Sequence, residues 1–261
     1  MDSQVAVITG STRGIGFGLA QGFLTAGWQV VISGRSQTTV EAVISGISKD
    51  LQKKVSGRAC DVKDCDHLQA LWEHSMNQFG HIDIWINNAG LGQPSLPFWE
   101  QGIATLKELV NVNLLGVMYG SQVAMRGMLS QGWGRLYNME GLGSDGRILL
   151  GQTTYGTSKR AMAYLTQSLS KESRDTPVSV AALSPGMVMT DLLVDNIDTS
   201  SPGFAKAKHI FNILADPVDT VAPWLVQQMV AQSVARDIRW LTRRKIAWRF
   251  LSAPFRNRNL F

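Results

Sequence analysis

Short apolar runs and longer mixed stretches take turns along most of the chain. The apolar runs predict strands at residues 4–9, 28–33, up to 60–62, 82–86, 135–139, 178–183 and 238–242. The mixed stretches between them predict helices beginning near residue 17, at about 37–53, 64–79 and 101–131, and around Tyr155. Such alternation predicts an α/β fold with a doubly wound parallel sheet, covered by helices on both faces.

Length and composition fit one folded unit. The chain has 261 residues, 44% hydrophobic and 17% charged, which is enough for a single domain with a full core. We place this domain at residues 1–242 and a separate tail at 243–261. Apolar runs are too short to cross a bilayer. Because a strand already starts at residue 4, we expect no signal or transit peptide, and a cytoplasmic location unless a targeting segment has been removed.

Cysteines and histidines do not predict a metal site. Cys60 and Cys65 are the two cysteines, too few for a disulfide framework, and they suit a reducing compartment. His67, His74 and His81 recur every seven residues, a spacing that separates neighbours on a helix by about 10 Å. That is too far to share one ion. We therefore expect these three histidines to lie on the surface without a metal ion.

The positive charge belongs to the C-terminal part of the chain. The net charge is +5, and residues 236–261 hold eight Lys and Arg against Asp237 as the one acid. The eight are Arg236, Arg239, Arg243, Arg244, Lys245, Arg249, Arg256 and Arg258. The other 235 residues carry 17 basic and 19 acidic groups. Nucleic-acid binding has no recognition motif to support it and is not expected.

A glycine-rich turn follows the first predicted strand and leads into a helix. It consists of Gly10, Ser11, Thr12, Arg13, Gly14, Ile15 and Gly16. Glycines in this place permit a tight turn and let the backbone approach a pyrophosphate, which then meets the positive N-terminus of the helix. The spacing G-x3-G-x-G differs from the commoner G-x-G-x-x-G. The strand–turn–helix context nevertheless predicts a dinucleotide site.

The second strand is followed by an arginine where NAD-binding proteins carry an acid. Arg35 stands at this position, and Arg13 lies in the neighbouring turn. An acid would bind the ribose 2′-hydroxyl of NAD, whereas arginine accommodates a 2′-phosphate. The two arginines favour NADPH/NADP⁺ as cofactor.

Tyr155 and Lys159 are four residues apart in a predicted helix, so both side chains project from one face. A phenol normally titrates near 10, and a nearby ammonium group stabilises the phenolate and lowers its pKa. Such a pair can give a proton to a carbonyl oxygen. The pattern is common by chance, and its meaning depends on the motifs around it.

Five motifs occur in order along the chain. They are T-G-x3-G-x-G at Thr9–Gly16, N-N-A-G at Asn87–Gly90, Asn113, Y-x3-K at Tyr155 and Lys159, and P-G-x3-T at Pro185–Thr190. As a set, over residues 4 to about 190, they resemble the classical short-chain dehydrogenases/reductases. The resemblance implies a Rossmann-type fold and hydride transfer between a nicotinamide and a carbonyl carbon.

The resemblance also implies a role for individual residues. Tyr155 is the expected proton donor, Lys159 lowers its pKa and holds the nicotinamide ribose, and Asn113 supports a water relay behind Lys159. The remaining residues expected to bind the cofactor, besides the glycine-rich turn and Arg35, are Asp61 and Val62 at the adenine, Asn88, Ala89 and Gly90 along the cleft, and Pro185, Gly186, Val188 and Thr190 near the carboxamide.

One position departs from the family pattern. The family usually carries a serine about thirteen residues before the tyrosine, in an N-x-S-S segment that binds the substrate carbonyl. Here Asn138 and Met139 are followed by Glu140 and Gly141, and a serine appears only at Ser144. Glu140 and Ser144 are the candidate substrate contacts. Either Ser144 takes the role, or Tyr155 and the backbone stabilise the oxyanion alone.

The same loop narrows the resemblance. The segment from Asn138 to Ser144 is similar to that of the plastid chlorophyll(ide) b reductases, as are 183–193, 211–217 and 238–242. This similarity implies reduction of the C7 formyl group of a chlorin to hydroxymethyl with NADPH, and it makes the plastid stroma or the thylakoid surface an expected location. There are two alternatives to this function. The substrate is another tetrapyrrole, ketone or lipid carbonyl, or the protein has a non-catalytic NADP(H)- or pigment-binding role.

Two C-terminal segments suggest partners. Residues 191–217 read as an apolar lid over a substrate, or equally as core contacts of the last helices. Residues 243–261 interleave Arg and Lys with Trp248, Phe250, Leu251, Phe255 and Phe261. That pattern suits a peripheral membrane contact, an oligomer contact or a solvated tail. We expect a homo-oligomer.

Overall fold

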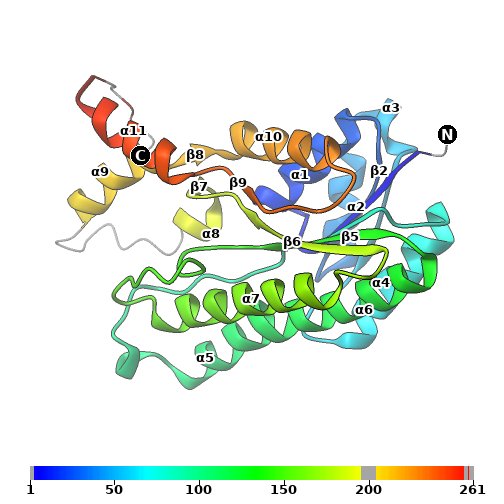
Figure 1. Ribbon diagram of the computed structural model, residues 1–261, viewed down its shortest axis with the longest axis horizontal. Coiled ribbons are helices and arrows are strands. Elements are labelled where there is room, and N and C mark those ends of the chain that lie inside the picture. The colour runs from blue at the N-terminus through cyan, green and yellow to red at the C-terminus, as the bar shows by residue number, and fades with distance from the viewer. Residues whose placement is uncertain (1–2, 195–203, 256–257, 259–261) are drawn as a thin grey trace.

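The computed structural model describes residues 3–194, 204–255 and 258. Its main sheet has seven parallel strands in the order β3-β2-β1-β4-β5-β6-β9 (Figure 1). The strands are β1 (Val5–Ile8), β2 (Gln29–Gly34), β3 (Val55–Ala59), β4 (Ile84–Asn87), β5 (Gly134–Met139), β6 (Val178–Ser184) and β9 (Ile238–Arg239). The predicted Rossmann-type parallel sheet is confirmed.

Helices cover both faces of the sheet, each with its own core. On one face lie α1 (Gly14–Thr25), α2 (Gln37–Ser45), α3 (Lys49–Gln52) and α10 (Val218–Val230), with Phe23 and Leu225 among the buried contacts. On the other lie α4 (Cys65–Phe79), α5 (Ile103–Val110), α6 (Gly116–Gln131) and α7 (Thr153–Glu172), with Leu71 and Met128 in the core. The two-sided burial explains why the strands read as continuous apolar runs.

Two predicted elements differ from the structure. The helix expected at 37–53 is divided into α2 and α3, because Gly46 ends α2 and Ile47 turns into the core at 8% exposure. The strand expected to reach 60–62 ends at Ala59, so Cys60, Asp61 and Val62 lie in the turn that leads to α4. That turn gives α4 its N-cap, Asp64, whose carboxylate accepts from the backbone N–H groups of residues 66 and 67.

The C-terminal third adds a small layer at the carboxyl end of the sheet. Strands β7 (Val188–Met189) and β8 (Asp216–Pro217) pair with each other, and α8 (Asp191–Val194) and α9 (Phe204–Leu214) lie between them in the chain. The expected tail contains a helix, α11 (Arg243–Ser252), followed by a 3₁₀ turn, η3 (Ala253–Phe255). Residues 195–203 of the expected lid, and 256–257 and 259–261 of the expected tail, lie outside the described residues.

One buried carboxylate joins these C-terminal elements. Asp216 is 4% exposed and accepts hydrogen bonds from Trp240 Nε1 at 2.6 Å, Arg249 Nη2 at 2.7 Å and Arg258 Nη2 at 3.0 Å. Burial alone would raise the pKa of Asp216, but these donors hold it below its usual value. Contacts therefore cross the boundary expected at residue 242. Within the described residues, no helix has the length and apolar character needed to span a membrane.

Candidate active site

The tyrosine and the lysine lie one turn apart on α7, as their spacing predicted. Lys159 is 5% exposed, and its Nζ atom lies 5.8 Å from the centre of the Tyr155 ring. The same Nζ donates to the backbone carbonyl of Met139, at the end of β5, over 3.1 Å. The lysine thus bridges the tyrosine and the end of a central strand.

The protonation of the pair is dominated by burial. Burial lowers the pKa of Lys159 to about 8, with the charge of Glu140 acting in the opposite direction. Burial raises the pKa of Tyr155 to about 12. The pKa of the phenol is therefore raised in this structure instead of lowered as the sequence led us to expect, because burial dominates it.

Asn113 connects the loop after β4 to α7. It lies in a single π-helical turn, Asn111–Leu115, between α5 and α6. Its amide accepts from the backbone N–H of Leu91 at 2.7 Å, donates to the carbonyl of the same residue at 2.8 Å, and contacts Ser158 Oγ at 3.5 Å. Insertions of this kind often mark functional positions in helices. The water relay expected behind Lys159 stays a prediction.

The glycine-rich turn is closely packed against the loop after β4. Gly10 has φ +61°, and a Cβ atom on it would lie 2.8 Å from Ala89 Cα. A Cβ atom on Gly16 would lie 2.5 Å from Asn88 Nδ2. The backbone N–H groups of Asn88 and Ala89 donate to Thr9 Oγ1 at 3.0 and 3.1 Å. Side chains are excluded at both glycines, so the turn packs against this loop through its backbone.

The start of α1, next to this turn, is where we expect the pyrophosphate of the dinucleotide. Arg13 is the N-cap residue of α1, and its side chain makes no hydrogen bond to the first turn of the helix. The positive end of α1 is therefore left to an anion. Ser11 is held in the turn by its Oγ, which donates to the carbonyl of Ile8 at 2.7 Å. Thr12 packs against Gly34, where a Cβ atom would lie 2.7 Å from Thr12 Cγ2.

The residues expected at the adenine lie at the ends of β2 and β3. Arg13 and Arg35 are both exposed, and Arg13 Nη1 lies 3.4 Å from Asp191 Oδ2. Asp61 Oδ1 accepts from the backbone N–H of Lys63 at 3.1 Å, and Val62 is buried against Gly116. Their contact with a cofactor stays a prediction.

The turn after β6 brings Thr190 to the start of α1. Gly186 has φ +74°, a left-handed conformation that glycine adopts without strain, directly after Pro185. The turn leads into β7, in which Val188 is 5% exposed. Thr190 Cγ2 lies 3.6 Å from where a Cβ atom on Gly14 would be. The first and last of the five motifs therefore meet.

Glu140 and Gly141 stand in the segment where the family usually carries its serine. A Cβ atom on Gly141 would lie only 2.5 Å from the Tyr155 hydroxyl oxygen. The displaced Ser144 is 5% exposed, and its Oγ accepts from the backbone N–H of Gly141 at 3.1 Å. In the described residues, neither Ser144 nor Glu140 hydrogen-bonds the Tyr155 hydroxyl. Their substrate contact stays a prediction.

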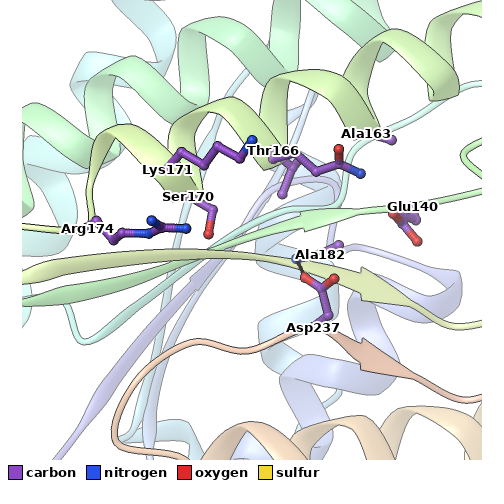
Figure 2. Close-up of a pocket in the computed structure, with 9 residues that line it drawn as sticks. Glu140, Ala163, Thr166, Ser170, Lys171, Arg174, Ala182 and Asp237 are labelled. Atoms are coloured by element: carbon purple, nitrogen blue, oxygen red, sulfur yellow. Dashed lines mark hydrogen bonds between the residues drawn. The ribbon is translucent and has the colours of Figure 1, made fainter.

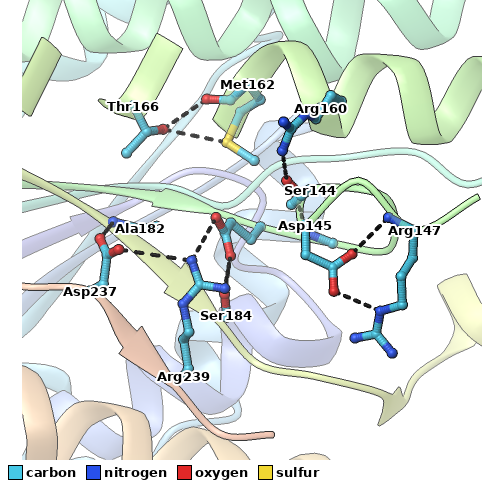
Figure 3. A network of polar contacts seen from close by, with 12 residues as sticks. Ser144, Asp145, Arg147, Arg160, Met162, Thr166, Ala182, Ser184, Asp237 and Arg239 are labelled. Atoms are coloured by element: carbon cyan, nitrogen blue, oxygen red, sulfur yellow. Dashed lines mark hydrogen bonds and ion pairs between the residues drawn. The ribbon is translucent and has the colours of Figure 1, made fainter. Parts of the chain in front are cut away.

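The carboxylate of Glu140 has other partners. It is 7% exposed, accepts a short hydrogen bond from the Ser184 hydroxyl, and lies 3.4 Å from the guanidinium of Arg239 on β9 (Figure 3). It also borders a cavity of about 250 Å³ between α7, β6 and β9 (Figure 2). Neither Tyr155 nor Lys159 lines that cavity. Glu140 links three strands at the carboxyl end of the sheet.

A glutamine that carries no sequence signal positions the start of α7. Gln93 is 1% exposed, and its Oε1 accepts from the backbone N–H of Tyr155 at 3.1 Å. Its Nε2 donates to the carbonyl of Gly151 at 2.9 Å. A residue 62 positions earlier in the chain thus supplies the cap that the first turn of α7 needs. Nothing in the local sequence marks it.

Exposed apolar side chains surround this end of α7, and we call them the apolar rim. They come from the loop that follows β4 and from the loop between β5 and α7, which are joined by a 3.2 Å hydrogen bond from Leu96 N–H to the carbonyl of Gly151. Trp99 is 84% exposed, Ile148 91% and Leu150 87%. The other members are Leu96, Phe98, Ile103, Leu142 and Leu149.

Comparison with known proteins decides the family. The model of the family described as short chain dehydrogenase matches residues 4–200. The chain belongs to this family. Its members are oxidoreductases that use a nicotinamide cofactor.

The relatives include chlorophyll(ide) b reductases. The chain is 40% identical over 230 residues to chlorophyll(ide) b reductase NOL, chloroplastic, of Arabidopsis thaliana, covering 86% of this chain and 65% of that protein. It is 34% identical to probable chlorophyll(ide) b reductase NYC1, chloroplastic, of Oryza sativa, covering 98% and 53%. The 3-oxoacyl-[acyl-carrier-protein] reductase FabG of Aquifex aeolicus is 33% identical, with 74% and 77% covered. The chain thus spans less than two thirds of NOL and about half of NYC1.

Solved structures agree on the fold. A 3-ketoacyl-(acyl-carrier-protein) reductase from Brucella melitensis, complexed with NADH, has a TM-score of 0.78 at 22% identity, covering 92% of this chain and 97% of that one. An alcohol dehydrogenase from Thermococcus sibiricus, complexed with 5-hydroxy-NADP, has a TM-score of 0.76 at 21% identity, covering 91% and 96%.

Proposed function

We propose that the protein is an NADPH-dependent carbonyl reductase that converts the C7 formyl group of chlorophyll(ide) b to hydroxymethyl. The observation that carries this is the site formed by Tyr155, Lys159 and Gly141 beneath the apolar rim. The similarity to NOL and NYC1 extends over 86% and 98% of the chain and supports the pigment as substrate. Both are described as chloroplastic, which makes the plastid stroma the proposed location if the protein comes from a plastid-bearing cell, and the cytoplasm otherwise.

The proton in this reaction comes from the Tyr155 hydroxyl. When bound, the nicotinamide supplies a hydride to the formyl carbon. As that carbon is reduced, Tyr155 Oη gives its proton to the carbonyl oxygen, and the positive charge of Lys159 stabilises the phenolate that remains. Asn113 orients the neighbouring loop, and the Met139 carbonyl holds the ammonium group in place.

The lack of the usual serine suits a large, flat substrate. At Gly141 a Cβ atom would lie only 2.5 Å from the Tyr155 hydroxyl oxygen, so glycine leaves the phenol free of a neighbouring side chain at this position. The oxyanion is then stabilised by Tyr155 and backbone groups. The apolar rim provides contact surface for the ring and covers it from water.

The phosphate groups are held at the start of α1. Arg13 and Arg35 supply two positive charges for the 2′-phosphate of NADPH, and no acid stands at the end of β2 to bind a ribose hydroxyl. Asp61 and Val62 contact the adenine in this arrangement, and Thr190 contacts the carboxamide.

The C-terminal helix is the proposed contact with a membrane surface. In α11, Trp248 and Leu251 are 61% and 72% exposed, and Arg243 and Arg244 are exposed as well. Basic and apolar side chains together suit an anionic membrane surface such as the thylakoid. The segment 191–217 acts as the lid over the pigment, and the protein works as a homo-oligomer.

The test is reduction of the pigment by the purified protein. We expect NADPH with chlorophyllide b or chlorophyll b to give loss of the formyl absorption bands, and Tyr155→Phe to abolish turnover while NADPH still binds. Chlorophyllide a, which has no formyl group, is the matched control substrate. Binding of NADPH without any change in either b pigment would reject the proposed substrate.

A further inference from the structure

Three consecutive residues at the end of β5 meet the two candidate catalytic side chains. The carbonyl of Met139 accepts from Lys159 Nζ at 3.1 Å. Gly141 packs so closely against the Tyr155 hydroxyl that a Cβ atom on it would lie only 2.5 Å from the phenol oxygen. Glu140 lies between them, and its backbone N–H donates to the carbonyl of Leu183 at 2.8 Å. Its conformation therefore sets the positions of both neighbours.

The side chain of Glu140 is fixed by two strands. A carboxylate that is 7% exposed is costly unless it is hydrogen-bonded and paired. The Ser184 hydroxyl at the end of β6 donates to one carboxylate oxygen of Glu140. The guanidinium of Arg239, a residue of β9, lies 3.4 Å from the same carboxylate, and Figure 3 shows Ser184 and Arg239 side by side. Arg239 is itself 44% exposed and shared with Asp237 at 3.8 Å. Because Arg239 is partly exposed and shared, it compensates only part of the buried negative charge of Glu140.

We propose that Glu140 is a positioning residue for Tyr155 and Lys159, acting through the backbone of residues 139–141 and through its negative charge. The inference rests on the proposed function for its kinetic consequence. It goes beyond that function because it assigns a positioning role to Glu140, which lies in the segment where the family usually carries serine.

The charge of Glu140 keeps the buried lysine protonated. Burial lowers the pKa of Lys159, and Glu140 raises it. The charged or titratable groups around this region come from three places in the fold. They are Tyr155 and Lys171 on α7 with Arg174 just after it, Glu140 just after β5, and Asp237 and Arg239 at β9. Arg239 opposes the effect of Glu140, while Asp237 is 58% exposed and screened by water.

Two substitutions test the charge with opposite signs. Glu140→Gln keeps the shape and an acceptor for Ser184 but removes the charge, so the pKa of Lys159 falls. Arg239→Gln leaves the Glu140 charge without its guanidinium, so the pKa of Lys159 rises. Both are measured by carbon NMR of lysine labelled at Cε, with the Lys159 signal assigned by its loss in Lys159→Arg.

The matched control is Asp145→Asn. Asp145 lies on the same loop but pairs with Arg147 at 2.6 Å near the surface, so its removal leaves Lys159 unchanged. In kinetics, the decline of the rate with rising pH begins at lower pH in Glu140→Gln, and Glu140→Asp restores part of the wild-type profile. Circular dichroism shows whether each variant is folded. If Glu140→Gln does not fold, the Lys159 pKa is still measured in Arg239→Gln, whose side chain is exposed in the wild type.

Opposite shifts of the Lys159 pKa support the inference. An unchanged pKa in either folded variant, or shifts in the same direction, would overturn it. The NMR measurement needs no pigment, so an inactive protein with opposite shifts rejects the proposed substrate and leaves the role of Glu140 standing.

Discussion

The backbone N–H of Tyr155 donates to the side-chain Oε1 of Gln93 over 3.1 Å. This bond joins the candidate proton donor to the loop after β4, which also carries the N-N-A-G motif. Since Gln93 also binds the carbonyl of Gly151, it holds both ends of the segment in which α7 begins. The position of the phenol therefore depends on a residue outside every motif.

We expect Gln93→Ala to destabilise the protein by about 1 to 2 kcal/mol, because buried hydrogen-bonding groups of Tyr155 and Gly151 lose their partner. Displacement of the phenol should also lower the turnover number by about tenfold or more. Thermal denaturation and pigment reduction measure the two effects. Gln69→Ala, on the exposed face of α4, is the control and should leave both unchanged. If Gln93→Ala and Gln69→Ala had the same stability and the same turnover number, Gln93 would have no positioning role.

Restoring a serine at residue 141 should harm the enzyme. The new Cβ atom would lie 2.5 Å from the Tyr155 hydroxyl oxygen, so either α7 or the strand end must move. We expect a loss of about 1 to 3 kcal/mol in unfolding free energy and weaker turnover. Gly46→Ser, at the end of α2, is the control, because its φ is −79° and a Cβ atom there would meet its nearest neighbour at 3.5 Å. Faster reduction by Gly141→Ser would show that the site lacks a donor it needs.

Exchange of Arg35 for aspartate should change the cofactor preference. The carboxylate would repel a 2′-phosphate and bind the ribose hydroxyls of NADH. We expect the ratio of dissociation constants, NADH over NADPH, to fall by about tenfold or more. Fluorescence titration of the reduced cofactors gives both constants. Arg58→Asp, on the neighbouring strand β3, is the charge-matched control. A ratio that stays constant would assign the preference to other residues.

Asp216 makes the stability of the C-terminal layer dependent on pH. Its folded pKa lies below the unfolded value, so its contribution is fully present above the unfolded pKa of about 4 and is lost as the pH falls through the folded pKa. Asp216→Asn should cost roughly 3 kcal/mol at pH 7, since it leaves Arg249 and Arg258 without their carboxylate. Urea denaturation at pH 7 and pH 3 measures this. The difference between wild type and variant should shrink at the lower pH, and a constant difference would contradict the assignment.

The sequence predicted the sheet and the tight turns beside it well, because both depend on local signals. Apolar runs define the strands, and glycines with fixed spacing define the turns, so Gly10, Gly16 and Gly186 could be placed without a structure. The helix at 37–53 was wrong because Gly46 and the burial of Ile47 outweigh an otherwise helical pattern.

What the sequence did not predict consists of contacts between distant residues. Gln93 and Tyr155 are 62 positions apart, and Glu140 and Arg239 are 99 apart. Each pair forms only after the strands have assembled, and a lone glutamine or glutamate in a loop has no pattern that indicates its partner. The direction of the Tyr155 pKa was missed for the same reason, since burial depends on the whole fold.

The end of β5 also limits how this enzyme can evolve. Residues 139, 140 and 141 serve three neighbours at once, namely Lys159, the pair Ser184 and Arg239, and the Tyr155 hydroxyl. A mutation at any of them changes the fitness effect of mutations at the others, so the segment is a site of strong epistasis. We therefore expect a serine at residue 141 to be tolerated only together with compensating changes at its partners.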